Sequence, residues 1–146
     1  MNEQVTGSGP PDVPRAYRSA VARWGMPRPA DRAKAEFGDL VATAQGGQVI
    51  LVHRGDQEWA ALIPVPPAAV ADLAHLTAQD QTSVHITGFP SSIVAVWQQW
   101  EMAAARAHLT QLIRLVHRYR CACVLRSGNR PVAILAPIEA AALIEQ

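Results

Sequence analysis

The chain has 146 residues, of which 49% are hydrophobic and 17% are charged, and its formal net charge is +1. This length and globular composition fit one compact domain or two very small ones. No run of about 18 apolar residues could span a bilayer, and the N-terminus lacks the basic-then-apolar pattern of a secretory signal. We therefore expect a cytoplasmic protein with no membrane partner.

Charge is distributed unevenly along the sequence. Residues 55–100 contain four acidic residues and no Lys or Arg, whereas residues 101–130 contain six Arg and a single Glu. Arginine suits bidentate contacts with phosphate groups. This segregation favours a protein that presents one basic surface, such as a nucleic-acid-binding protein.

The N-terminal arm is predicted to span residues 1–29. Residues 1–14 are polar and rich in Pro and Gly, which is typical of a terminus without fixed structure. Residues 15–24 predict a short basic helix, which the Gly and Pro residues of 25–29 interrupt.

Residues 30–76 predict the first structural unit. A helix over about 32–44 begins after Asp31 as its N-cap and ends at Gly46 and Gly47. Two β-rich runs, 48–53 and 58–63, flank a short polar turn and predict a hairpin. A short helix over 68–76 follows.

Residues 77–101 predict a polar linker followed by a helix that carries two tryptophans. At helical spacing, one face of this helix would hold four apolar side chains: Ile93, Val96, Trp97 and Trp100. We expect this face to pack against the other half of the chain or against a second copy, and the alternative is a groove that binds a partner protein.

Residues 102–146 predict a second unit with the same order of elements. A helix ends near 118, strands over 120–125 and 130–135 form a hairpin, and a short helix covers 138–145. The two units align at a constant spacing and without a gap, which places 33–41 over 105–113 and 49–54 over 121–126. A unit of about 45 residues rarely buries enough apolar surface to fold alone. The two units are therefore expected to share one core, or the chain to form a homo-oligomer.

The second unit carries a recognisable series of motifs. Ala105 and Arg106 stand at the expected helix start, Leu109 and Leu112 follow along the helix, and residues 126–137 read Arg-Ser-Gly-Asn-Arg-Pro-Val-Ala-Ile-Leu-Ala-Pro. This series resembles the Phd/YefM family of antitoxin-like DNA-binding proteins, and the likeness covers roughly 32–73 and 104–145. It implies an α+β fold in which two helix–β-hairpin–helix repeats pack as an intramolecular pseudo-dimer.

The resemblance implies a non-enzymatic protein that binds double-stranded DNA as a transcriptional repressor or autoregulator. One alternative is an antitoxin that neutralises a toxin through residues 66–100. Another is a protein-interaction module that has lost DNA binding.

The basic residues supply the candidate DNA contacts. Lys34 and Arg106 occupy matched positions at the expected helix starts, where a cation opposes the helix dipole and phosphate binding would explain it. Arg114 and Arg118 share a helix face, while Arg54 and Arg126 flank the two hairpin turns. The full candidate set is Arg28, Arg32, Lys34, Arg54, Arg106, Arg114, Arg118 and Arg126.

The remaining reactive residue types form no catalytic or metal-binding motif. Cys121 and Cys123 lie on one face of an expected strand, where small core residues are the favoured interpretation, and the five His are scattered. A metal site would need further ligands at suitable spacing. We therefore expect no cofactor, no metal and no enzymatic activity.

Overall fold

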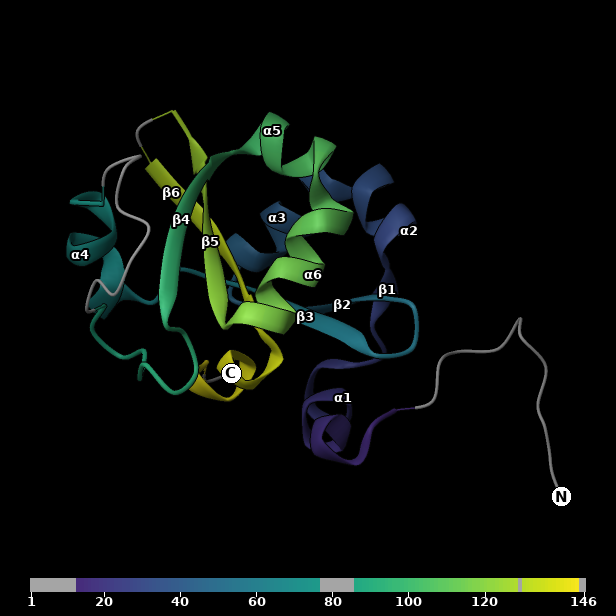
Figure 1. Ribbon diagram of the computed structural model, residues 1–146. Helices are drawn as coiled ribbons and strands as arrows, with labels where there is room; N and C mark the ends of the chain where they lie inside the picture. The colour runs from purple at the N-terminus through teal and green to yellow at the C-terminus, as the bar shows by residue number, and fades with distance from the viewer. Residues whose placement is uncertain (1–12, 77–85, 129, 145–146) are drawn as a thin grey trace, which may run out of the picture.

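The computed structural model describes residues 13–76, 86–128 and 130–144, which form a mixed α+β fold (Figure 1). A six-stranded mixed sheet runs through the molecule in the strand order β1-β2-β3-β6-β5-β4. Helices pack on both of its faces. The predicted fold class, α+β, is confirmed at this level.

The N-terminal half, residues 28–76, follows a short helical segment made of the 3₁₀ helix η1 (Arg15–Tyr17) and α1 (Arg18–Trp24). Its own elements are β1 (Arg28–Pro29), α2 (Ala30–Ala35), α3 (Phe37–Gln45), β2 (Ile50–Arg54), β3 (Glu58–Ile63), η2 (Pro67–Ala69) and α4 (Val70–Ala74).

The C-terminal half, residues 96–144, repeats this order. Its elements are β4 (Val96–Glu101), α5 (Met102–Ala107), α6 (Leu109–Tyr119), β5 (Cys121–Ser127), β6 (Arg130–Pro137) and the 3₁₀ helix η3 (Ile138–Leu143). Both predicted hairpins are confirmed, as β2–β3 and β5–β6.

The two halves meet at the centre of the sheet. Strands β3 and β6 pair antiparallel, with Leu62 opposite Leu135 and Ala61 opposite Ala136. The outer strands β1 and β4 run parallel to β2 and β5 respectively. Because the central pair is antiparallel, the two hairpin turns lie at opposite ends of the sheet.

Two apolar layers hold these elements together. One face, here called the helical face, is covered by α2, α3, α5 and α6, and its core includes Phe37, Leu112 and Ile113. On the second face, η1 and α1, α4, η3 and residues 86–95 cover it, around the fully buried Trp59 and Trp97. The described residues contain no buried polar or charged residue, so burial of apolar side chains is the main stabilising term.

Each predicted motif helix is divided in two. The helix expected over 32–44 bends at Glu36 (φ −104°, ψ 16°), and its counterpart bends at the aligned residue His108 (φ −113°, ψ 21°). These angles lie near the bridge region, which interrupts the α-helical pattern. The Glu36 N–H still donates to the carbonyl of Arg32, so hydrogen bonding continues across the bend.

The gapless alignment of the two halves is correct for the helices and wrong for the strands. Ala33 and Ala105 both lie in the helical-face core, but Val52 lies there while the aligned Val124 lies on the second face. A shift by one residue restores the match, since Val52 then corresponds to Leu125 and both side chains lie in the helical-face core. One additional residue between helix and strand moves every side chain of that strand to the other face.

The tryptophan-bearing segment is a strand and not the predicted helix. Residues 96–101 form β4, which pairs with β5 at six positions from Val96 opposite Cys121 to Glu101 opposite Arg126. Alternate residues of a strand point to opposite faces, so Trp97 is buried on the second face while Trp100 packs on the helical face. The predicted single face of Ile93, Val96, Trp97 and Trp100 therefore does not exist.

The remaining expectations differ in smaller ways. The last predicted helix is the 3₁₀ helix η3, and the helix expected over 68–76 begins as η2 and continues as α4. The predicted short helix over 15–24 is confirmed as η1 and α1. The expected arm at 1–12 and the linker at 77–85 lie outside the described residues.

Candidate nucleic-acid interface

Two matched basic residues, Lys34 and Arg106, come into contact where the two halves adjoin on the helical face. Arg106 Nε donates a hydrogen bond to the backbone oxygen of Lys34 at 3.0 Å, and both residues are exposed. Lys34 belongs to α2 and Arg106 to α5, the equivalent helices of the two halves. These helices therefore bring one cation from each half to a common place on the surface.

Both cations lie in the last turn of their helix, so the prediction that they stand at helix starts is wrong. Because hydrogen bonding continues across the bends at Glu36 and His108, neither position is a free helix end, where the effect of the dipole is strongest. The dipole thus gives no reason to invoke phosphate at Lys34 or Arg106. The relevant observation is that the Arg106 side chain contacts the backbone of Lys34, which brings two basic residues of different halves to the same part of the surface. Among the described residues, no ion pair includes either of them.

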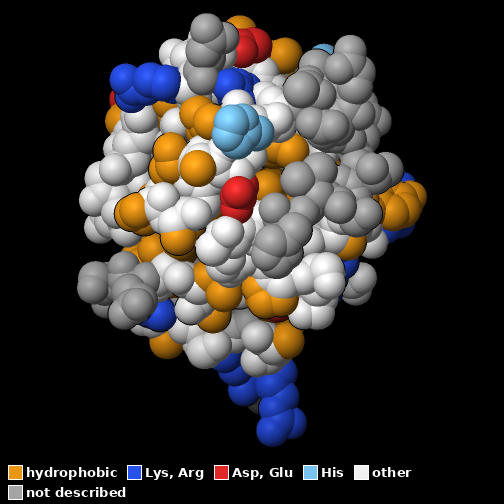
Figure 2. Space-filling model, turned by 90° about the vertical axis from the view of Figure 1, so that its left-hand side faces the viewer, with side chains coloured by type: hydrophobic (Ala, Val, Ile, Leu, Met, Phe, Trp, Pro, Cys, Tyr) orange, Lys and Arg blue, Asp and Glu red, His pale blue; other side chains and the backbone are white. Residues whose placement is uncertain are grey.

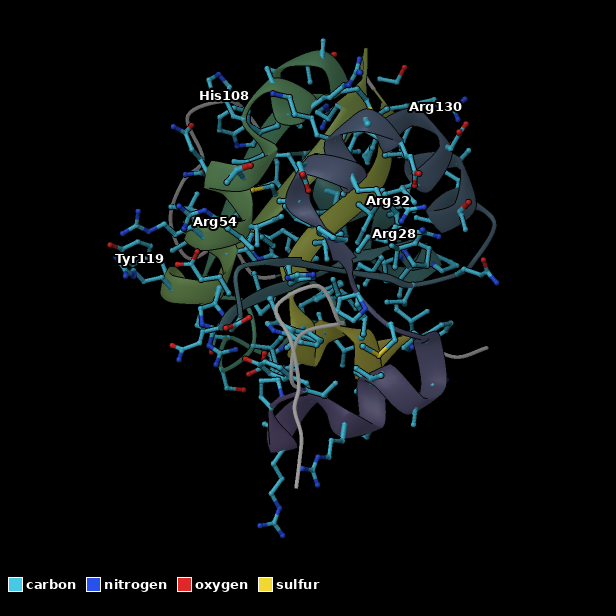
Figure 3. All side chains as sticks on the ribbon, turned by 90° about the vertical axis from the view of Figure 1, so that its right-hand side faces the viewer. Arg28, Arg32, Arg54, His108, Tyr119 and Arg130 are labelled. Carbon is cyan, nitrogen blue, oxygen red and sulfur yellow. The ribbon has the colours of Figure 1, made fainter. Side chains whose placement is uncertain are left out.

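Arg28 and Arg32 form a second basic group around one carboxylate. Arg28 Nη1 lies 3.7 Å from Glu36 Oε1, and Arg32 Nε lies 3.4 Å from Glu36 Oε2. Figure 3 shows the two arginines close together beside α2. The Arg32 side chain is 66% exposed, so this ion pair is weak and would yield readily to a phosphate.

Arg54 and Arg114 are held by Glu58. Arg54 Nη1 lies 2.6 Å from Glu58 Oε1, and Arg114 Nε lies 3.7 Å from Glu58 Oε2. The Glu58 side chain is only 18% exposed. This carboxylate joins β3, β2 and α6, and it neutralises part of the charge that the sequence pattern predicted for DNA contact.

Arg54 and Arg126 are not brought together. They lie on β2 and β5, whose hairpin turns are at opposite ends of the sheet, and the alignment shifted by one residue matches Arg54 with Ser127. Arg126 lies on β5, opposite Glu101 of β4 and Pro131 of β6. Their coincidence in the gapless alignment is therefore not a structural equivalence.

Arg118 lies in the last turn of α6 and is exposed, next to Tyr119, which is 60% exposed. Figure 3 shows Tyr119 at the margin of the molecule, on the same side as Arg54 and away from Arg28 and Arg32. Apart from Arg126, the candidate residues thus form two groups, Arg28 with Arg32 and Arg54 with Arg114 and Arg118, and Lys34 and Arg106 lie at the junction of the halves.

Sequence reasoning missed the carboxylates and Tyr119. Glu36 and Glu58 each follow an arginine by four residues, and the first of these pairs lies on a helix, where this spacing brings side chains together. That spacing was available in the sequence. The contact between Arg106 and Lys34 depends on how the halves pack, and no local signal indicates it.

The side of the molecule formed by α4 and β4 has a different character. Figure 2 shows mostly apolar and uncharged groups where described residues are visible, with Lys and Arg side chains at the margins. This agrees with the absence of Lys and Arg from residues 55–100. The basic residues are therefore concentrated elsewhere.

The two cysteines are buried in the helical-face core, as expected. A hydrogen bond to Cys121, together with burial, raises the pKa of Cys123 well above its usual value. A protonated, buried thiol is a poor nucleophile. No cluster of three or more metal-binding side chains occurs among the residues described, and none of the helices there has the length and apolarity needed to cross a membrane.

Comparison with known proteins adds no assignment at this point. No protein-family model matches the sequence, and searches of curated proteins and of solved structures gave no match.

Proposed function

We propose that this chain is a non-enzymatic DNA-binding protein that acts as a transcriptional repressor or autoregulator of the Phd/YefM type. Its two halves are the repeats, joined in one chain as an intramolecular pseudo-dimer. Double-stranded DNA binds across the helical face, with Lys34 and Arg106 at the centre of the contact. Arg32 and Arg118 extend the contact to either side.

The observation that carries this proposal is the convergence of Lys34 and Arg106. The contact of Arg106 with the Lys34 backbone places a basic residue of each half on one part of the surface, and a phosphate bound there would be attracted by both positive charges. The hydrogen bond to the Lys34 carbonyl uses one of the five N–H donors of the Arg106 guanidinium. The other donors suit a phosphate, which arginine can bind through two parallel hydrogen bonds.

The sheet supports the tandem arrangement. Its strand order is the same read from either edge once β1, β2 and β3 are exchanged for β4, β5 and β6. In the alignment shifted by one residue, Leu62 corresponds to Leu135, and these two residues face each other in the β3–β6 ladder. A local two-fold axis through this pair would relate the halves and set α2 against α5.

The antitoxin alternative receives less weight. Residues 66–100 were its expected toxin-binding segment, yet Leu73, Phe89 and Trp97 within that segment are at most 4% exposed. Side chains committed to the core are not available to a partner protein. The interaction-module alternative predicts no DNA affinity and is decided by the same experiment.

The experiment is a mobility-shift titration on DNA from upstream of the gene, at two salt concentrations. The Lys34→Ala/Arg106→Ala double variant should bind more weakly, and the slope of log affinity against log salt should fall by about two, since each lost phosphate contact lowers it by about 0.9. The matched control is Arg15→Ala/Arg18→Ala, which removes the same charge from η1 and α1 on the second face.

The control variant should retain the affinity and slope of the original protein. Melting curves of both variants exclude loss of fold as the cause. A larger loss in the control than in the Lys34/Arg106 variant would place the DNA surface on the second face. Absence of salt-dependent binding by the unmodified protein would contradict the proposal.

A further inference from the structure

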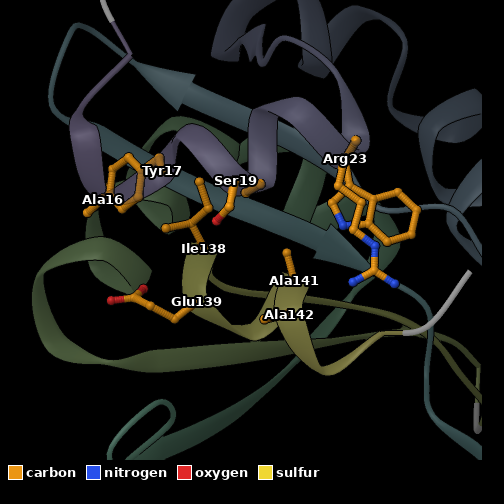
Figure 4. A pocket seen from close by; sticks show the side chains of 10 residues that line it. Ala16, Tyr17, Ser19, Arg23, Ile138, Glu139, Ala141 and Ala142 are labelled. Atoms are coloured by element: carbon orange, nitrogen blue, oxygen red, sulfur yellow. The ribbon is translucent and has the colours of Figure 1, made fainter.

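A mostly apolar cavity of about 270 Å³ lies between α1 and η3, on the second face of the sheet (Figure 4). Tyr17 and Trp24 form its aromatic walls, the buried Ala141 forms part of its floor, and the exposed Ala142 lies at its rim. Arg23 and Glu139 supply the charged groups, toward opposite ends in Figure 4. The cavity is therefore separate from the proposed DNA surface on the helical face.

The corresponding corner of the other half is filled. There, residues 86–95 cover α4, and Phe89, which the gapless alignment matches with Tyr17, is 4% exposed and packs edge-on against Trp97 at 5.1 Å between ring centroids. Asp72 Oδ2 also accepts hydrogen bonds from the backbone and hydroxyl of Thr87, at 2.9 and 2.7 Å. An aromatic side chain and two hydrogen bonds thus close that corner.

The α1–η3 corner lacks such a closure. No residue of η1 or α1 is fully buried, although Tyr17 and Trp24 pack at the edge of the second-face core. The Tyr17 ring lies against Trp59 at 5.3 Å between centroids, which leaves the space beside Ala141 open. Aromatic walls over a floor of small side chains favour a flat ring as the occupant.

The charges around the cavity select for an anionic substituent. Glu139 Oε2 lies 2.6 Å from Arg120 Nη1, so its charge is balanced within the protein. Arg23 packs over the Trp24 ring at 5.0 Å and takes part in no ion pair among the described residues. The cavity therefore offers one cation beside an aromatic ring, an arrangement that binds a carboxylate through charge-assisted hydrogen bonds.

We propose that the cavity between α1 and η3 binds a bicyclic aromatic carboxylic acid, with its rings between the aromatic walls and the alanine floor and its carboxylate on Arg23. The size supports a two-ring ligand, since an apolar cavity of about 150 Å³ accommodates benzene. This site does not depend on the proposed DNA-binding function.

The test uses isothermal titration calorimetry of the full chain with 2-naphthoate and with the neutral 2-naphthamide. The unmodified protein should bind 2-naphthoate at one site, more tightly than the amide. Arg23→Gln should weaken 2-naphthoate binding about tenfold, the effect of losing one charge-assisted hydrogen bond, and leave 2-naphthamide binding unchanged. Arg18→Gln, on the same helix but outside the cavity, should bind both compounds normally.

Ala142→Phe provides a second, independent variant. Ala142 is exposed at the rim, so a larger side chain there should fill the cavity without unfolding the protein. This variant should lose both compounds while its melting temperature is maintained. Two-dimensional NMR should locate the binding-induced shifts at Ser19, Arg23 and Ala141.

Three results would overturn the proposal. The first is the absence of 2-naphthoate binding to the unmodified protein. The second is equal affinity of the unmodified protein and Arg23→Gln for 2-naphthoate, and the third is a set of NMR shifts confined to the helical face.

Discussion

The two outer edges of the sheet are built differently, although they occupy matching positions. Strand β4 pairs with β5 at six positions, whereas β1 pairs with β2 at two, Arg28 opposite Val52 and Pro29 opposite His53. Beyond β1, a cavity of about 190 Å³ lies between residues 23–28 and the edge of β2. The edge strand of the C-terminal half is thus paired along six residues, and that of the N-terminal half along two.

The sequences before the two helices explain this difference. Residues 96–101 read Val-Trp-Gln-Gln-Trp-Glu and can all hydrogen-bond to a neighbouring strand. The matching residues 24–29 include Gly25, at φ 96°, and two prolines, which lack the backbone N–H that a ladder requires. Equivalent topology therefore coexists with unequal edge pairing, and the following predictions test how far the two halves differ.

The largest effect is expected at Trp97, which closes the C-terminal edge on the second face. Trp97→Ala should lower the free energy of unfolding by about 3–5 kcal/mol, because it removes a fully buried indole and leaves a cavity. Trp100→Ala, at a half-buried position on the helical face, should cost about 1–2 kcal/mol. Urea denaturation of both variants checks this, and equal costs would contradict the difference in burial between the two positions.

A smaller and more symmetric effect is expected at the centre of the sheet. Leu62→Ala and Leu135→Ala should each cost about 2–5 kcal/mol, since both side chains are at most 2% exposed in the helical-face core. The two values should agree closely. The cost of the double variant should differ from the sum of the single costs, because effects at neighbouring residues are not additive. A cost confined to one of the two would break the proposed two-fold relation.

The ion group around Glu58 should contribute less to the free energy of unfolding than these core leucines. Glu58→Gln should cost about 1 kcal/mol, because it leaves Arg54 and Arg114 without their shared carboxylate. Glu139→Gln is the matched control, since its ion pair with Arg120 is more exposed and should contribute less. Differential scanning calorimetry at low and high salt measures both. An unchanged melting temperature in Glu58→Gln would show that this ion group does not stabilise the fold.

The smallest effect concerns pH at the α1–η3 corner. Burial, followed by the negative charge of Glu139, raises the pKa of Tyr17, while Arg120 opposes this shift. The folded state therefore favours the neutral phenol, so this contribution to stability is complete below the unfolded pKa of about 10 and declines as pH rises toward the folded value. Tyr17→Phe should flatten the alkaline decline in melting temperature slightly. A steeper decline would indicate that the phenolate is the favoured form.

Local patterns in the sequence were sufficient for the hairpins and for the helix ends at Gly46 and Gly47. They were insufficient for β4, because apolar residues at 93, 96, 97 and 100 satisfy helical spacing while pairing with β5 decides the outcome. The face of each strand also depended on one inserted residue that a gapless comparison conceals. For the candidate site, matching Lys34 with Arg106 was possible from sequence, whereas their contact and the competing carboxylates depend on tertiary packing.

The antiparallel pairing of β3 with β6 has a consequence for how this chain could change during evolution. In a dimer of two identical chains, every substitution appears twice and must suit both sides of the interface. Here the partner strand belongs to the same chain, so its pairing is intramolecular and does not depend on the concentration of the protein. Each half can then change alone. Such freedom permits three differences between the halves: the short β1, the cavity between α1 and η3, and a carboxylate at Glu58 where the other half has Pro131.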